Sequence, residues 1–186
     1  MDLAARLGRI SPIGAASTDE RALVRAAQAG SLDAMERLYR AHWPRAYRAA
    51  RLVTGDDAAA EDIAQEAFLA AVRNLDRFDR RRPFAPWLHR IVVNRAIDWT
   101  RARRLRAEVE LGDYVPAPPA PEPNGDIFAR LHDLPPDHRA VIVLRYLLEY
   151  TPGEIAELLD LPRGTVNSRL RRGLDTLKSD ERIHGA

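Results

Sequence analysis

A proline-rich stretch at residues 115–125, VPAPPAPEPNG, constrains the fold of this chain more than any other feature. Five of its eleven residues are proline, which has no backbone N–H to donate and favours extended geometry. We therefore expect a proline-rich linker over residues 107–125. The remaining chain should form two small domains, residues 18–106 and 126–182, after a flexible N-terminal tail at residues 1–17.

Apolar residues on both sides of this linker recur at helical spacing. One stripe follows Ser31, which can cap a helix, and consists of Leu32, Met35, Leu38 and Tyr39. A further helix is expected from Trp87 to about residue 106, and no alternating strand pattern extends beyond a few residues. The sequence therefore predicts an all-α fold of two small helical domains.

Residues 151–174, TPGEIAELLDLPRGTVNSRLRRGL, have the pattern of a helix-turn-helix. Thr151 and Glu154 have the spacing of a capping box, and the Asp160-Leu161-Pro162 segment should end the first helix. Asp160 occupies a turn position that is often glycine, and aspartate tolerates the left-handed conformation there better than most residues. Residues expected to face inward are Ile155, Ala156 and Leu159 on the first helix, and Val166, Leu170 and Leu174 on the second.

That arrangement leaves a polar outer surface on the second helix, formed by Arg163, Thr165, Asn167, Ser168, Arg171 and Arg172. Arginine and asparagine can read base edges in a major groove, and helix N-termini favour phosphate. The alternative is a solvated basic helix in an ordinary helical bundle.

Charge is strongly polarised in the first domain. Residues 55–79 contain seven acids and two arginines, whereas residues 80–106 contain nine arginines and one acid. The acidic segment repels DNA and the basic segment attracts it. We therefore expect the acidic helix to bind a protein partner and the basic helix to bind nucleic acid.

Three aromatic residues lie among these arginines. Phe84 lies between Pro83 and Pro86, in what is predicted to be a loop, and is the aromatic best placed to touch an unpaired base. Trp99 aligns with apolar residues at helical spacing and is expected in the core. Trp87 could lie in the core or contact an unpaired base.

Several classes of function are disfavoured by the sequence. With no cysteine there are no disulfides, thiolate metal sites or cysteine nucleophiles, and the five histidines are scattered. No phosphate-binding loop, nucleophile elbow, signal peptide or membrane span is recognisable. We expect a cytoplasmic protein that is not an enzyme, with no cofactor or metal and no membrane insertion.

Taken together, the segments resemble a known family. Residues 61–99, EDIAQEAFLAAVRNLDRFDRRRPFAPWLHRIVVNRAIDW, resemble region 2 of the sigma-70 family of RNA polymerase sigma factors. Residues 134–177, LPPDHRAVIVLRYLLEYTPGEIAELLDLPRGTVNSRLRRGLDTL, resemble its region 4. A chain with only these two regions resembles the extracytoplasmic-function (ECF) group of this family.

The resemblance implies a sigma factor that binds core RNA polymerase and promoter DNA in transcription initiation, with an anti-sigma factor as a further candidate partner. Residues that would dock on the β′ clamp helices of the polymerase are Asp62, Gln65, Glu66 and Phe68. Residues that would melt or contact the −10 element are Phe84, Trp87, Arg90, Asn94, Arg95, Arg101, Arg103 and Arg104. The outer surface of residues 163–172 would read the −35 element, and its domain would also meet the β flap.

Two positions depart from the family pattern. Asn167 stands where a lysine is common, which leaves the −35 sequence open, and Pro152-Gly153 replaces a bulkier pair at the start of a helix. The competing hypothesis is a helix-turn-helix regulator without a polymerase-subunit role. Such a regulator would usually dimerise on palindromic DNA, and it would not explain the acidic and basic halves of the first domain.

Overall fold

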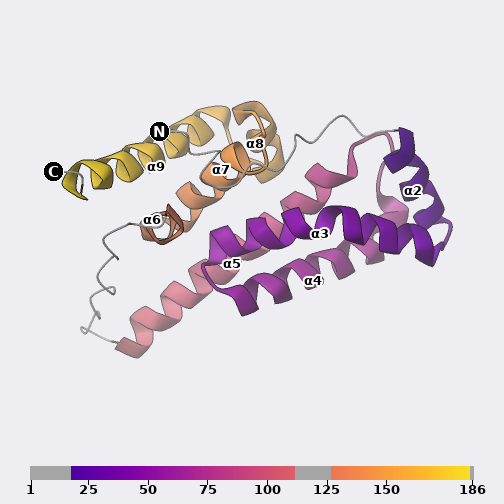
Figure 1. Ribbon diagram of the computed structural model, residues 1–186, viewed down its shortest axis with the longest axis horizontal. Coiled ribbons are helices and arrows are strands. Elements are labelled where there is room, and N and C mark those ends of the chain that lie inside the picture. Colours follow the sequence, from indigo (N-terminus) through magenta and orange to yellow (C-terminus); the bar gives the residue numbers. More distant parts are fainter. Residues whose placement is uncertain (1–17, 112–126, 185–186) are drawn as a thin grey trace.

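The structure is a computed structural model that describes residues 18–111 and 127–184. All regular structure within these residues is helical (Figure 1), so the predicted all-α fold is confirmed. The expected N-terminal tail and most of the expected linker lie outside the described residues.

The N-terminal domain is organised around the long helix α3. Its elements are α2 (Thr18–Gln28), α3 (Leu32–Thr54), α4 (Asp57–Arg73), a short 3-10 helix η1 (Leu75–Arg77) and α5 (Phe84–Leu111). Helix α3 packs against α2, α4 and α5. Helix α5 begins three residues earlier than expected and continues to Leu111, into the segment where the linker was expected to begin.

Local side-chain chemistry fixes the start and end of α3. Ser31 accepts a hydrogen bond from the backbone N–H of Ala34 at 3.3 Å, as the sequence predicted. At the other end Gly55 adopts a left-handed conformation (φ 74°), which costs glycine little because it has no Cβ. The chain then turns directly into α4, which Asp56 caps.

The C-terminal domain contains the predicted helix-turn-helix. Its elements are α6 (Ile127–Asp133), α7 (Pro136–Tyr146), α8 (Pro152–Leu159) and α9 (Arg163–His184). Helix α9 packs on both α7 and α8. Gly173 permits the approach to α7, because a Cβ at this position would lie 2.6 Å from Cδ1 of Ile142.

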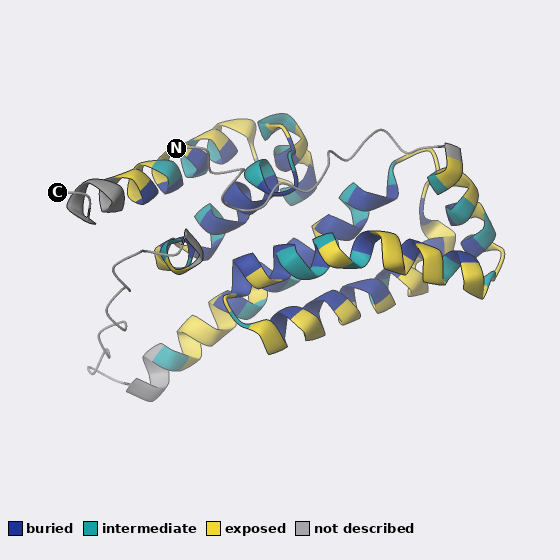
Figure 2. Ribbon diagram, viewed as in Figure 1, coloured by how far each residue is buried: buried dark blue, intermediate teal, exposed yellow. Residues whose placement is uncertain are grey.

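The two domains are packed against each other, which the sequence did not lead us to expect. Helices α6, α7 and α8 lie along α3 and α5 (Figure 1). Residues Val141, Ile142, Val143 and Leu144 of α7 are each 0% exposed. Figure 2 shows buried residues along much of this helix. Four consecutive residues cover every side of a helix, so α7 must be buried all round, partly by its own domain and partly by the other. Both domains thus contribute to one continuous hydrophobic core.

Candidate nucleic-acid interface and docking surfaces

The turn of the helix-turn-helix is built as the sequence predicted. The hydroxyl of Thr151 accepts the backbone N–H of Glu154 at 3.3 Å, and the Glu154 carboxylate accepts the backbone N–H of Thr151 at 2.7 Å. The Thr151 hydroxyl and backbone hydrogen bonds lower the pKa of Glu154. Asp160 ends α8 in the left-handed conformation (φ 54°), and α9 begins after Pro162. Helix α9 is therefore held at a fixed angle to α8.

The outer surface of α9 is open to solvent. Arg163, Asn167, Arg171 and Arg172 are exposed, and Thr165 and Ser168 are partly exposed. On the opposite side Val166 and Leu170 are buried, as predicted. Arg169 differs from its neighbours because it turns back to Asp137 on α7, at 3.3 Å. Leu158 is buried on α8 although the sequence prediction did not include it.

The prediction that Phe84 lies in an accessible loop is wrong. Phe84 is the first residue of α5 and is only 3% exposed. Its ring packs against those of His42, Phe78 and Trp87 with centroids 5.2 to 5.8 Å apart. Pro83 and Pro86 do not exclude a helix here, since proline is tolerated in a first turn. Phe84 therefore supports the surface from below and does not present a face to a base.

Other aromatic and polar residues of α5 are more accessible. Trp87 is half-buried and stacks obliquely on Phe78, with centroids 4.7 Å apart. Trp99 is also half-buried, and the guanidinium of Arg103 lies 5.1 Å from its ring centroid. Asn94 is partly exposed and Arg90 is exposed. The accessible surface of α5 thus combines an aromatic ring, an amide and cations.

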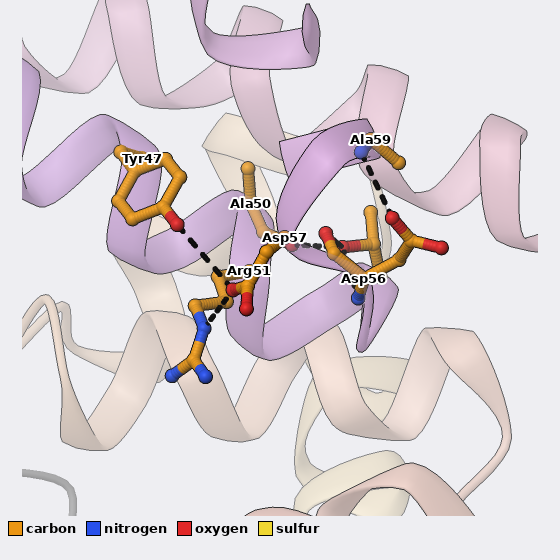
Figure 3. Close-up of polar contacts among 7 residues, drawn as sticks. Tyr47, Ala50, Arg51, Asp56, Asp57 and Ala59 are labelled. Atoms are coloured by element: carbon orange, nitrogen blue, oxygen red, sulfur yellow. Dashed lines mark hydrogen bonds and ion pairs between the residues drawn. The ribbon is translucent and has the colours of Figure 1, made fainter. Parts of the chain in front are cut away.

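Three arginines of α5 are neutralised by carboxylates of this chain. Arg95 pairs with Glu66 of α4 at 2.6 Å, Arg101 pairs with Asp137 of α7 at 2.7 Å, and Arg103 pairs with Asp56 at 2.7 Å. Figure 3 shows the start of α4, where Asp56 accepts the N–H of Ala59, and Asp57 accepts hydrogen bonds from Tyr47 and Arg51. The Ala59 N–H and then Arg103 lower the pKa of Asp56.

Arg104 makes a weaker contact across the domains. Its guanidinium donates to the carbonyl of Leu134 at 3.3 Å.

On α4, three of the four predicted docking residues are exposed. Asp62, Gln65 and Glu66 face solvent. Phe68 is only 6% exposed and packs against the rings of Tyr39 and Trp43, with centroids 4.9 and 6.1 Å away. Its side chain packs between α3 and α4 and lines an apolar groove between these helices, so its part in docking remains a prediction.

The apolar residues that face solvent beside these acids were not predicted. Leu69 is 54% exposed, Val72 is 45% exposed and Tyr39 is 38% exposed. They line a groove of about 400 Å³ between α3 and α4, together with Met35 and Gln65. Leu69 lies four residues after Gln65 and seven after Asp62, so helical spacing could have placed it on the same face as these two residues.

The contact between the domains is held by buried polar groups. Arg139 is 2% exposed and donates to the carbonyls of Val53 and His132, both at 2.6 Å, and of Leu134 at 3.1 Å. Burial lowers the pKa of Arg139 to about 10, so it stays charged at neutral pH. Val53 lies in the last turn of α3, where a cation is favourable beside the partial negative charge of the helix C-terminus.

A second buried hydrogen bond, between a histidine and a tyrosine side chain, joins the two domains. Nδ1 of His89 on α5 lies 2.8 Å from the hydroxyl of Tyr150, which precedes α8. His89 is 0% exposed and Tyr150 is 5% exposed. Burial lowers the pKa of His89 to about 3 and raises the pKa of Tyr150, so both groups are neutral at physiological pH.

Comparison with protein families covers both domains. The family description of sigma-70 region 2 matches residues 38–106, and that of sigma-70 region 4 matches residues 125–177. Within the described residues no helix is both long enough and apolar enough to cross a membrane.

Individual proteins show the same likeness. The ECF RNA polymerase sigma factor SigW of Bacillus subtilis is 35% identical over 171 residues, which cover 82% of this chain and 91% of SigW. SigM of Mycobacterium tuberculosis is 31% identical over 172 residues, covering 89% and 88% of the two chains. Among solved structures, CnrH in complex with the cytosolic domain of CnrY superposes with a TM-score of 0.65 at 29% identity, over 86% of this chain and 94% of CnrH.

Proposed function

The chain belongs to the sigma-70 family of RNA polymerase sigma factors, in its ECF group, and from this premise we propose how its surfaces divide promoter recognition among them. The protein directs RNA polymerase to promoters and acts in transcription initiation. Like other sigma factors it is a polymerase subunit without enzymatic activity of its own.

The −35 element is read by the outer surface of α9. The observation that carries this assignment is that Arg163, Asn167 and Arg171 are exposed, whereas Val166 and Leu170 of the same helix are buried. Side chains of this kind, on the second helix of a helix-turn-helix, reach base edges in a major groove. Thr165, Ser168 and Arg172 flank them and suit phosphate contacts.

The −10 element is bound by α5. Trp87 and Asn94 supply a stacking surface and an amide for an unpaired base, while Phe84 supports Trp87 from the core. The strand is held by the arginines of this helix, Arg90, Arg95, Arg101, Arg103 and Arg104. Since the protein itself does not hydrolyse a nucleotide, binding energy from these contacts must offset the cost of opening the duplex.

Core polymerase docks on α4. The acidic edge formed by Asp62, Gln65 and Glu66 lies beside the apolar groove that contains Leu69 and Val72. A charged edge steers association, and a desolvated apolar patch provides affinity. We assign this combined surface to the β′ clamp helices, and a second contact with the β flap to the C-terminal domain.

Promoter recognition requires the two domains to separate. Positions −35 and −10 are about 25 base pairs apart, which is about 85 Å at roughly 3.4 Å per base pair. In the packed form a single carboxylate, that of Asp137, contacts both Arg101 on α5 and Arg169 on α9. The two DNA-reading helices are thus too close together to reach both elements. The packed form is the resting state, and binding to polymerase opens it.

We propose that the protein acts in the cytoplasm, where it would meet its polymerase partner. We further propose an anti-sigma factor as a partner of the packed form. RpoE of Bartonella quintana, solved with the anti-sigma factor NepR, shares the fold at 21% identity with a TM-score of 0.64.

Run-off transcription with purified core polymerase and a genomic promoter library tests the division of these surfaces. Addition of the chain should give transcripts from promoters that share two elements at constant separation. Substitutions on α9 should change the upstream element alone, and substitutions on α5 the downstream element alone. Transcripts whose two elements both change with a single α9 substitution would contradict the assignment.

A further inference from the structure

A buried histidine lies beneath the aromatic rings of the proposed −10 surface. His42 of α3 is 7% exposed, and the centroid of its ring lies 5.2 Å from that of Phe84. The Phe84 ring in turn meets the ring of Trp87 at a steep angle of 66°, with centroids 5.6 Å apart. His42 is thus separated by one phenylalanine from the ring that we assign to an unpaired base, although it has no part in the surfaces assigned above.

A carboxylate from α2 fixes the orientation of this histidine. Nε2 of His42 lies 3.0 Å from a carboxylate oxygen of Glu20, which belongs to the first turn of α2. A ring that is held by packing alone can rotate about its last side-chain bond, because that torsion has broad minima. A ring that also donates a hydrogen bond is held in one plane. Glu20 therefore fixes the face that His42 presents to Phe84.

The hydrogen bond to Glu20 contributes orientation more than stability. Nδ1 of His42 is buried and has no hydrogen-bond partner among residues 18–111 and 127–184. A buried polar atom without a partner costs free energy, and an apolar side chain of similar volume would avoid that cost. What the histidine adds at this position, and a leucine or phenylalanine would not, is a ring whose plane is set by α2.

The opposite end of α2 holds the second support of Trp87. The ring of Phe78 stacks obliquely on that of Trp87, with centroids 4.7 Å apart. The side-chain amide of Gln28 donates to the backbone carbonyls of Leu75 at 2.9 Å and Phe78 at 3.0 Å. Phe78 and Phe84 are therefore both anchored to α2, one through each end of the helix.

We propose that Glu20 and His42 are positioning residues for promoter opening, which act through Phe84 to hold the Trp87 ring in the plane on which an unpaired −10 base stacks. The inference rests on the proposed function of α5. Stacked rings must lie parallel and offset, so a ring that is free to tilt presents a poorer surface to a base. Because His42 is buried, its effect is transmitted through packed rings and not by contact with DNA.

Two substitutions of Glu20 separate this hydrogen bond from the charge of the carboxylate. Glu20→Gln and Glu20→Ala both remove the negative charge, but the glutamine carbonyl can still accept the N–H of His42 and alanine cannot. The control is Tyr47→Phe, which removes a 3.3 Å hydrogen bond from α3 to Asp57 at the start of α4. Each chain is assembled with core polymerase and titrated with a single-stranded oligonucleotide of the non-template −10 strand and with a duplex −35 fragment.

The expected result is a loss confined to the −10 strand. Glu20→Ala should bind this strand about fivefold more weakly than Glu20→Gln, which is the low end of the change that loss of one stacked base produces. Tyr47→Phe should bind the strand as the wild type does. All variants should bind the −35 duplex and core polymerase with equal affinity, because neither surface includes Trp87.

Fluorine NMR of the full chain reports on the ring directly. The chain has three tryptophans, so labelling with 5-fluorotryptophan gives three resonances, and Trp87→Phe identifies that of Trp87. The Trp87 resonance should move or split in Glu20→Ala and keep its position in Glu20→Gln. The resonance of Trp99, about three turns further along α5, should be unchanged in both, whereas a general loosening of the domain would move it as well.

Equal −10 affinities of Glu20→Ala and Glu20→Gln would overturn the proposal. An equal loss in Tyr47→Phe or on the −35 duplex would also overturn it, because it would show a general loosening of the domain. Trp87→Ala separates this failure from failure of the proposed function. If Trp87→Ala weakens −10 binding while the two Glu20 variants stay equal, the inference alone fails; if Trp87→Ala binds the strand like the wild type, the role proposed for Trp87 fails and the inference fails with it.

Discussion

Removing the hydroxyl of Tyr150 should release the packed form while leaving each domain folded. The Tyr150→Phe substitution keeps the ring, which is 5% exposed, and deletes its 2.8 Å hydrogen bond to Nδ1 of His89. The bond joins two domains and contributes to neither domain alone. Its loss should therefore affect the docking equilibrium and not the folding of the helices.

The expected size follows from the burial of His89. Its ring is 0% exposed and its Nε2 has no hydrogen-bond partner among the described residues, so in the variant both ring nitrogens would be buried without partners there. A buried polar group left unsatisfied costs about 1–3 kcal/mol. In the open form water can satisfy the same nitrogen. The ratio of open to packed molecules should rise by about 5- to 160-fold.

Energy transfer between two dyes measures this ratio directly. The chain has no cysteine, so cysteines introduced at the exposed Arg73 and Lys178 would be the only labelling sites. Tyr146→Phe is the matched control, because Tyr146 lies on α7, is half-buried and makes no hydrogen bond through its hydroxyl to residues 18–111 or 127–184. Identical transfer distributions for wild type, Tyr150→Phe and Tyr146→Phe would refute the argument that the buried bond holds the domains together.

Three further predictions concern acid and the two remaining surfaces. Burial lowers the pKa of His89 from 6.5 to about 3, so its contribution to domain packing is complete above pH 6.5 and is lost at about 1.4 kcal/mol per pH unit as the pH falls toward 3. Open molecules with low energy transfer should therefore accumulate between these pH values. An energy-transfer distribution that stays constant from pH 7 to 4 would contradict this. Asp62→Arg with Glu66→Arg should weaken core binding with unchanged circular dichroism, because surface substitutions move stability by about 0.5 kcal/mol or less; unaltered core affinity would remove α4 from the docking surface. Arg171→Ala and Asn167→Ala should each reduce transcription from cognate promoters. If the residue contacts a base, promoter binding should weaken by about 1–3 kcal/mol and the preference at one −35 position should relax; if it contacts phosphate, the loss should be even across sequences. Normal activity profiles in both variants would exclude α9 as the reader of the −35 element.

Local chemistry made the helices and the helix-turn-helix predictable. The capping box of Thr151 and Glu154 and the left-handed Asp160 depend on residues within a few positions of each other, and the structure contains both. The exposed positions of α9 followed from helical spacing in the same way. Caps, turns and exposed helix positions depend on short segments, so they can be predicted from the sequence.

Contacts between distant segments were harder to foresee. Phe84 was expected to lie in a loop because two prolines flank it, yet burial against Phe78 and His42 outweighs that local signal. Phe68 was carried over from the family pattern without regard to the neighbouring rings of α3 that cover it. The four consecutive apolar residues 141–144 did carry a signal for the packed domains, since no single face of a helix can hold them all.

The position of Asp137, between a guanidinium of α5 and one of α9, has a consequence for how molecules of this protein are distributed in a cell. A genome offers about 10⁶ to 10⁹ non-specific sites that compete for any chain with its DNA-reading surfaces exposed. While Asp137 engages Arg101 and Arg169, part of that attraction is cancelled within the molecule. Because we propose that the packed form is the resting state, we expect newly made copies to bind polymerase before they bind DNA. Competition with other sigma factors would then be decided at the enzyme, before any promoter is searched.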